Sequence, residues 1–259
     1  MALRVDRGRQ RRLPADETER DRLTAGNVVL TLGNMMAVSG EDAVTTGVAG
    51  SLILTSDYRV ADPSRVWPLL ERRRAELAAI GAHHVFVHTS ISEPDRVLVT
   101  MALHTVEPVA DLLRSHVFFD WFDAVGVADL PAVFAGELVD RFHIEPGHHW
   151  TAKAPAVVIA GVTVVRDVDT LLGQVHRTRD LFRRNGIENV WIFRALDDPH
   201  EVMFLQDVAD EASARRWLER PETAEKWLAE AGVGAYPPVF VGALRHVMRI
   251  DVAEHVNGP

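Results

Sequence analysis

One stretch of this sequence occurs twice. Residues 126–144 read GVADLPAVFAGELVDRFHI, and residues 232–250 read GVGAYPPVFVGALRHVMRI. The two copies match in register from Gly126/Gly232 to Ile144/Ile250, and both contain a Val-Phe pair with a glycine two residues after the phenylalanine. A match in register over this length indicates a tandem duplication. Each half of the chain is therefore expected to fold into the same unit.

The composition limits the classes of function. The chain has 259 residues and a formal net charge of −9, which argues against a general binder of phosphate backbones. It contains no cysteine, so it forms no disulfide and uses no thiolate, as suits the reducing cytoplasm. No apolar run approaches the ~20 residues that span a bilayer, and the N-terminus lacks the apolar segment of a signal peptide. We expect a cytoplasmic protein with no nucleic-acid or membrane partner.

The first 24 residues are polar, with a short run of arginines followed by acidic residues. Two interpretations are open: a basic arm for nucleic acid, or a disordered tail. The tail is favoured because the positive run is short and soon neutralised, and we expect it to be dispensable for folding. Residues 27–38 are more apolar. They either pair as an extra strand or contain the true start, at Met35 or Met36.

Strand and helix patterns alternate in the same order in both halves. In the first half, strand-like runs occupy 51–58, 83–90, 96–104 and 133–144. Asp62 and Pro63 begin a helical stripe that ends at Gly81, and a second helix is expected over 107–125. The second half repeats this order at an offset of 105 until one residue is inserted near 231. Its strands are expected over 157–165, 189–195, 201–208 and 239–250, and its helices over 169–185 and 211–231.

Each half therefore reads β-α-β-β-α-β, the ferredoxin-like arrangement, in the α+β class. Both helices of such a unit cover one face of its sheet, so two units bury their bare faces against each other. The domain organisation that follows is a largely disordered N-terminal tail (1–48), repeat 1 (49–146), a linker (147–154), repeat 2 (155–252) and a C-terminal tail (253–259).

This arrangement resembles the dimeric α/β-barrel superfamily, here with two tandem repeats forming the barrel within one chain. The segments RSHVFFDWFDAVG (114–126) and PAVFAGE (131–137) are similar to a group of actinobacterial two-repeat proteins. The superfamily includes antibiotic-biosynthesis monooxygenases without cofactors, haem-degrading monooxygenases, chlorite-dismutase-like haem proteins and polyketide cyclases. Some two-repeat members carry the label fatty-acid–CoA ligase. This chain is too short for an adenylating enzyme and has no Ser/Thr/Gly-rich phosphate loop, so that activity is not expected.

The histidines do not predict a metal site. His84 and His88 share a strand face, but four residues of strand separate them by about 13 Å. His83 and His84 are expected to point to opposite faces of the strand. His148 and His149 fall in the linker, and no H-E-x-x-H or Cys/His spacing occurs. We therefore predict no metal.

The resemblance implies a pocket under the second helix of repeat 1, where several monooxygenases and haem proteins of the superfamily bind their ligands. His116 on that helix is the leading candidate for catalysis, against the alternative of a surface histidine, and Asp120 and His88 complete the catalytic set. The residues expected to contact the ligand are His84, Phe86, Phe118, Trp121 and Tyr58.

The two second helices differ on one face. At the offset of 105, Val117, Phe118 and Trp121 stand where repeat 2 has Glu222, Thr223 and Lys226. Three large apolar side chains on a face expected to be wet require a cover, because burying each contributes roughly 1.5–3 kcal/mol. That cover is a second subunit, the N-terminal segment or a ligand. We favour a second subunit, and so a homo-oligomer joined through this helix.

The leading functional hypothesis is a barrel that binds a small apolar organic molecule, with chemistry like that of cofactor-independent monooxygenases or cyclases. No cofactor is then needed. A first alternative is a haem protein with His116 as the axial ligand. A second is a non-catalytic assembly protein whose aromatic helix is an oligomer interface.

Overall fold

The computed structural model describes residues 52–104, 109, 111, 113, 116–127, 129–144, 157–219, 221–234 and 237–250, without the side chains of residues 116–119 and 221–224. The predicted tails, the linker 147–154 and the stretch 27–38 lie outside these residues. In the first half the elements are β1 (Leu52–Arg59), η2 (Pro63–Arg65), α3 (Val66–Arg72), α4 (Arg74–Ala79), β2 (Ala82–Ser90), β3 (Arg96–Leu103), α6 (His116–Val125) and β4 (Ala132–His143). In the second half they are β5 (Val157–Val164), α7 (Val168–Arg177), α8 (Arg179–Arg184), β6 (Ile187–Ala195), β7 (Glu201–Val208), α9 (Glu211–Leu218), α10 (Pro221–Glu230) and β8 (Val239–Arg249).

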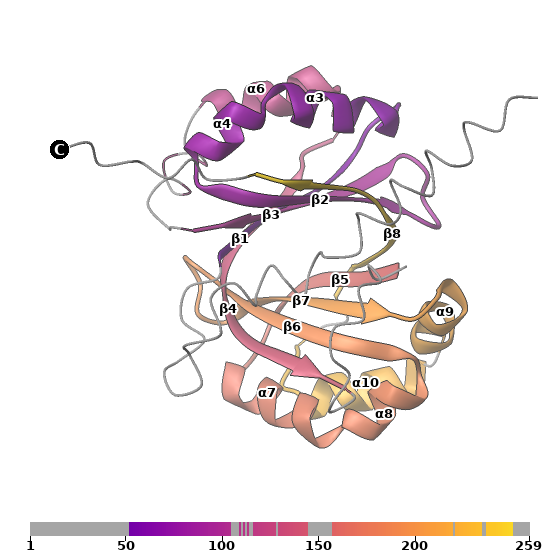
Figure 1. The fold of residues 1–259 in the computed structure, drawn as a ribbon. Coiled ribbons are helices and arrows are strands. Elements are labelled where there is room, and N and C mark those ends of the chain that lie inside the picture. Colours follow the sequence, from indigo (N-terminus) through magenta and orange to yellow (C-terminus); the bar gives the residue numbers. More distant parts are fainter. Residues whose placement is uncertain are drawn as a thin grey trace, which may run out of the picture.

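The strands close a barrel in the order β1-β3-β2-β8-β5-β7-β6-β4, with antiparallel pairing throughout. Figure 1 shows the two halves facing each other, with α3, α4 and α6 outside one half and α7 to α10 outside the other. The predicted pair of β-α-β-β-α-β units forming an intrachain dimeric α/β barrel is confirmed. Within the described residues, no helix is long and apolar enough to cross a membrane.

The last strand of each repeat joins the two halves. The first part of β4 pairs with β1 of its own repeat, and its later part pairs with β6 of the other. β8 does the same with β5 and β2. Each of these strands carries one extra residue at the same relative position, Val139 in β4 and Arg245 in β8. Bulges of this kind bend a strand and raise its twist, which lets both strands pass from one half to the other.

The core has three layers because strand residues alternate between the barrel interior and the outer faces. The interior cluster takes Phe86 from β2, Trp191 and Phe193 from β6, and the phenylalanines of the duplicated stretch, Phe134 and Phe240. Separate clusters pack the outer face of repeat 1 against α3, α4 and α6, and the outer face of repeat 2 against its own helices.

The repeated glycine of the duplicated stretch makes room for these phenylalanines. A Cβ on Gly136 would lie 2.6 Å from the Phe134 ring and 2.6 Å from the carbonyl oxygen of Arg194. A Cβ on Gly242 would lie 2.3 Å from the Phe240 ring. The motif Phe-x-Gly therefore encodes a ring folded over its own strand inside the barrel, and this explains why it appears in both copies.

The second helices require a correction to the predicted alignment. Trp121 is buried at 8% exposure in the outer core of repeat 1, and Trp227 packs at the corresponding place in repeat 2. Lys226, the residue predicted to match Trp121, is exposed. The offset is therefore already 106 at this point, and the inserted residue precedes Trp227 instead of falling near 231. Since each residue turns a helix by about 100°, an error of one residue places a buried side chain on the wet face.

The prediction that His83 and His84 point apart is also wrong. Their Nδ1 atoms lie 2.7 Å apart, within hydrogen-bond distance. The pairing of β2 with β3 shifts between Ala82 and His84, so His83 is an extra residue at which the strand alternation breaks. Burial and the neighbouring His104 and His84 lower the pKa of His83 to about 4.

Candidate functional site

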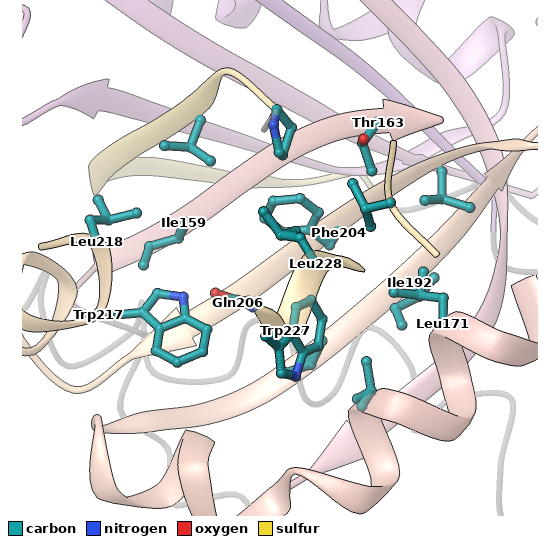
Figure 2. Close-up of a pocket in the computed structure, with 16 residues that line it drawn as sticks. Ile159, Thr163, Leu171, Ile192, Phe204, Gln206, Trp217, Leu218, Trp227 and Leu228 are labelled. Carbon is teal, nitrogen blue, oxygen red and sulfur yellow. The ribbon is translucent and has the colours of Figure 1, made fainter. Parts of the chain in front are cut away.

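An apolar cavity of about 70 Å³ lies between the outer face of the repeat 2 sheet and its helices α7, α9 and α10. This volume exceeds the ~10–15 Å³ that a single water needs. Figure 2 shows the lining side chains around a common space. They are Ile159, Thr163, Leu171, Val175, Val190, Ile192, Val202, Phe204, Gln206, Trp217, Leu218, Trp227, Leu228, Val233, Pro237 and Val239.

At the matching place in repeat 1, two large rings among the described residues pack in the outer core. Tyr58, at 4% exposure, occupies the position of Thr163, and Phe122, at 5%, occupies that of Leu228. The Tyr58 and Phe122 rings meet edge to face with centroids 5.5 Å apart. Burial raises the pKa of the Tyr58 hydroxyl, and the nearby Trp121 acts weakly in the opposite direction. Thr163 and Leu228 are smaller than these rings, which leaves more room at this place in repeat 2.

Two tryptophans form one side of the cavity. The Trp227 indole Nε1–H donates a 2.8 Å hydrogen bond to Thr178 Oγ1, which in turn donates to the carbonyl oxygen of Gln174 at 2.7 Å. Phe182 touches both indoles edge to face, with centroids 5.4 Å from Trp217 and 5.7 Å from Trp227. These contacts hold two flat aromatic surfaces toward the cavity.

Gln206 is the notable polar group of the lining. It lies on β7, is 5% exposed, and its Oε1 has no hydrogen-bond partner among the described residues. In Figure 2 its amide lies between the two indole rings. Repeat 1 has Met101 at the equivalent position, on the strand that pairs with β1. A buried amide oxygen without a partner costs about 1–3 kcal/mol, so an unbonded Gln206 needs an explanation that packing does not supply.

The described lining contains no His, Asp, Glu, Lys, Arg or Tyr. It can therefore bind and orient a molecule and exclude water, but it supplies no acid or base of its own. Among the described residues, no group of three His, Asp or Glu side chains is placed to hold a metal ion.

The predicted site residues fall into separate places. Tyr58 and Trp121 pack in the outer core of repeat 1. Asp120 is exposed on α6. The side chains of His116 and Phe118 lie outside the described part of the chain. Tyr58, Trp121 and Phe122 belong to one buried cluster, so these three residues have a packing role in the structure.

The remaining predicted residues, His84, Phe86 and His88, face the barrel interior on the other side of the sheet. The His84 and Phe86 rings stack with centroids 6.1 Å apart. His88 is 4% exposed, and neither ring nitrogen has a partner among the described residues. Burial lowers the pKa of His88 to about 4. The sheet therefore separates these three residues from Tyr58 and Trp121, and the eight do not form one site.

A buried carboxyl in the barrel was not anticipated from the sequence. Asp207 is 1% exposed, and its Oδ2 accepts a 3.1 Å hydrogen bond from Asn189, whose Oδ1 lies 2.7 Å from His143 Nδ1. Burial raises the pKa of Asp207 to about 8, with the Asn189 hydrogen bond acting in the opposite direction. Asp207 follows Gln206 in the sequence, but strand alternation directs the two side chains to opposite sides of the sheet.

The sequence contained a signal for the repeat 2 cavity. Comparing the repeats position by position pairs Thr163 with Tyr58 and Gln206 with Met101, both changes toward smaller or more polar side chains on an apolar strand face. In the second helices, the offset of 105 pairs Trp121 with Lys226 and hides the match of Trp121 with Trp227.

No protein-family model matches this sequence, and no curated protein matches it. Among solved structures, the chain is similar to an anthrone oxidase-like protein, with a TM-score of 0.59 and 11% identity over 79% of this chain and 94% of that one. It also resembles a proposed monooxygenase from Lactobacillus acidophilus (TM-score 0.48, 12% identity, 77% and 96% covered). A haem-degrading enzyme from Listeria monocytogenes matches with a TM-score of 0.40 and 10% identity over 74% and 98%. At such identities the similarity concerns the fold, and the chain has the dimeric α/β-barrel fold.

Proposed function

We propose that this protein binds a small, flat, largely apolar organic molecule in the repeat 2 cavity and orients it through a hydrogen bond to Gln206. The observation that carries the proposal is the buried Gln206 amide oxygen, which has no hydrogen-bond donor among the described residues, in an otherwise apolar space. A ligand hydroxyl or amide that bonds this group recovers most of the ~1–3 kcal/mol that an unsatisfied carbonyl costs. Apolar lining with one placed polar group is typical of sites for small molecules.

The indoles of Trp217 and Trp227 favour an aromatic ligand. Aromatic pairs that stack or meet edge to face contribute about 0.5–1.5 kcal/mol beyond the area they bury. Trp227 is held by its bond to Thr178, so little side-chain freedom remains to be lost on binding. The half-buried Trp217, Leu218, Trp227 and Leu228 form the helix side of the cavity.

The catalytic extension of this proposal is a monooxygenase-like reaction without a cofactor, in line with the anthrone oxidase-like neighbour. In such a reaction this cavity contributes shape, orientation and exclusion of water. The described lining offers no general base, so a His or Asp for proton transfer, as expected from the sequence, is not part of it. Oxygen consumption on addition of a bound aromatic compound tests this extension separately from binding.

Haem is not compatible with the described lining of this cavity. An axial ligand to haem iron is a His, Cys, Met or Tyr side chain, and none of these occurs among the lining residues. The alternative with His116 concerns a side chain outside the described residues. An absorbance spectrum of the protein purified with haem supplied tests that alternative, since a Soret band would support it.

Calorimetric titration with ethylbenzene and benzyl alcohol tests the binding proposal. These probes have nearly the same shape, and the methyl group of ethylbenzene is replaced by a hydroxyl in benzyl alcohol. Gln206→Met copies the repeat 1 residue and is expected to weaken benzyl alcohol binding about five- to tenfold while changing ethylbenzene binding little. The control is Lys226→Ala, at an exposed position on α10. If the wild-type protein binds neither probe, the cavity is not a ligand site. If the Met variant binds both probes as the wild type does, the proposed hydrogen bond from the ligand to Gln206 is refuted.

Self-association through the second helix of repeat 1 remains a proposal. Trp121 belongs to the core of its own chain, so it offers no anchor to a second subunit. At the corrected offset of 106, Phe118 matches Ala224 and Val117 matches Thr223, so Val117 is the residue that would carry such an interface. Sedimentation of the wild type and a Val117→Thr variant tests it, and a wild type that is monomeric at micromolar concentration would contradict it.

A further inference from the structure

An open depression on the surface of repeat 2 adjoins the cavity. It is lined by residues 163–166, Ala229 and residues 232–234. Thr163 and Val233 line both spaces. A molecule in the cavity that is longer than the cavity would therefore leave it past these two residues and reach the depression.

The rim of this depression differs from its counterpart in repeat 1. In repeat 1 the segment after Tyr58 carries Arg59, whose guanidinium is paired with Glu93 and Asp95, and then Ala61 two residues later. In repeat 2 the same segment carries Val164, which is 58% exposed, and then Arg166. Next to the opening, repeat 2 therefore has the apolar Val164 where repeat 1 has the paired Arg59. Two residues further along, repeat 2 has Arg166.

The backbone around Arg166 is fixed. Its N–H donates to the carbonyl oxygen of Gly232 at 2.9 Å, and the N–H of Val165 donates to that of His200 at 2.8 Å. A Cβ on Gly232 would lie 3.3 Å from the Arg166 Cβ, and Gly232 has a φ of +76°. Glycine here therefore both allows the turn and lets the Arg166 stem lie against the rim.

The charge of Arg166 is available to a ligand. It makes no ion pair within the described residues, and its side chain is exposed. The nearest carboxylate in sequence, Asp167, caps α7 by accepting hydrogen bonds from the Thr170 backbone N–H at 2.7 Å and from its hydroxyl at 2.8 Å. Those bonds, from the backbone first, lower the pKa of Asp167, and the charges of Arg166 and His200 act in the same direction. Because its oxygens are bonded at the start of α7, Asp167 forms no direct ion pair with Arg166 among the described residues.

We propose that the ligand is an amphipathic organic acid. Its apolar end occupies the cavity, its chain passes Thr163 and Val164, and its carboxylate or other anionic group binds Arg166. This inference rests on the proposed function of the cavity and names the class of its ligand. Arginine offers a planar pair of N–H donors that matches a carboxylate. The net charge of −9 repels anions from the protein as a whole, so a local cation decides whether an acid binds.

A matched series of ω-phenylalkanoates and ω-phenylalkanols, with two to five methylene groups, tests the proposal. Each pair shares its apolar part and differs in charge, and binding is followed by calorimetry and by tryptophan fluorescence. In the wild type the acids are expected to bind about tenfold more tightly than the alcohols at the chain length that spans the two spaces. Raising the salt concentration should reduce this preference.

Three variants complete the experiment. Arg166→Ala copies Ala61 of repeat 1 and is expected to remove the preference for acids while leaving alcohol binding unchanged. Arg166→Lys keeps the charge and should retain part of the preference for acids. Arg183→Ala, at an exposed arginine on α8 that pairs with Asp180, is the control for net charge.

The outcomes separate the two proposals. If neither acids nor alcohols bind the wild type, the cavity is not a ligand site and the proposed function fails. If both bind equally, or Arg166→Ala leaves the preference for acids intact, the cavity stands and the role of Arg166 is refuted.

Discussion

Exchanging two equivalent residues between the repeats should move the cavity from one half to the other. Thr163→Tyr introduces the ring that fills repeat 1, and Tyr58→Thr removes it from there. The repeats share their backbone frame, including the isolated bridges Val60–Val127 and Val165–Val233 beside these positions. Each side chain is therefore expected to project into its helix–sheet space as its counterpart does.

The cost of Tyr58→Thr follows from its burial. Truncating a buried aromatic ring to alanine costs about 3–5 kcal/mol, and threonine retains part of the side chain, so the lower end of about 3 kcal/mol applies. The expected loss is about 3 kcal/mol, or roughly 6–12 °C in Tm for a chain of this size.

Thr163→Tyr is expected to leave the free energy of unfolding within about 1 kcal/mol of the wild type, because the buried ring compensates for local crowding. It should abolish binding of benzyl alcohol, whereas Thr163→Val, which keeps the size of the side chain, should not. Urea unfolding and calorimetric titration measure the two effects. A folded Thr163→Tyr variant that binds the probe with unchanged Kd would refute the assignment of the cavity as the site.

Two further predictions concern residues that the sequence placed in a ligand site. The pKa of His88 is about 4 in the folded protein and 6.5 when unperturbed. As the pH falls, the unfolded chain therefore takes up the proton first. The contribution of neutral His88 to the free energy of unfolding is complete above pH 6.5 and is lost as the pH falls toward 4. His88→Phe, which copies Phe193, should remove about 3 kcal/mol of that loss. Urea unfolding at pH 7.5 and 4.5 measures it. If the free energy of unfolding falls equally between these pH values in the wild type and the variant, the prediction is contradicted. Trp121→Lys should lower the free energy of unfolding by about 4 kcal/mol because it removes a core ring and buries a charge, and a variant as stable as the wild type would show that Trp121 is not part of the core.

The fold could be predicted from the sequence because duplication shows each signal twice. The matched glycines Gly81 and Gly186 adopt φ values of +81° and +75°, and Gly126 and Gly232 adopt +81° and +76°. Positions that need this backbone conformation keep glycine in both copies. The Val-Phe-x-Gly match similarly marks the barrel interior. These features are local, and local features can be read without knowing which strands meet.

The candidate site could not be predicted in the same way, because a cavity arises where side chains are small and such residues form no recognisable motif. Thr163 and Leu228 are unremarkable residues until Tyr58 and Phe122 are seen filling the same space. The aromatic richness of the first repeat pointed to its helix as a binding face, whereas in the structure Trp121 and Phe122 of that helix pack in the outer core. His83 shows the second limit, since a bulge of one residue reversed the direction that strand alternation predicts for it.

Fusion of the two halves explains how they could become unequal. In a dimer of identical chains, a residue that fills one helix–sheet cavity fills both. In this chain Tyr58 packs in the outer core of repeat 1, whereas its counterpart Thr163 lines the cavity of repeat 2. Both positions lie outside the barrel interior. That interior still requires both repeats, because β4 and β8 each pair with strands of the opposite half and Phe134 and Phe240 pack in one shared cluster. Repeat 1 is thus held in the molecule by the barrel it completes, which leaves the helix–sheet space of repeat 2 free to diverge.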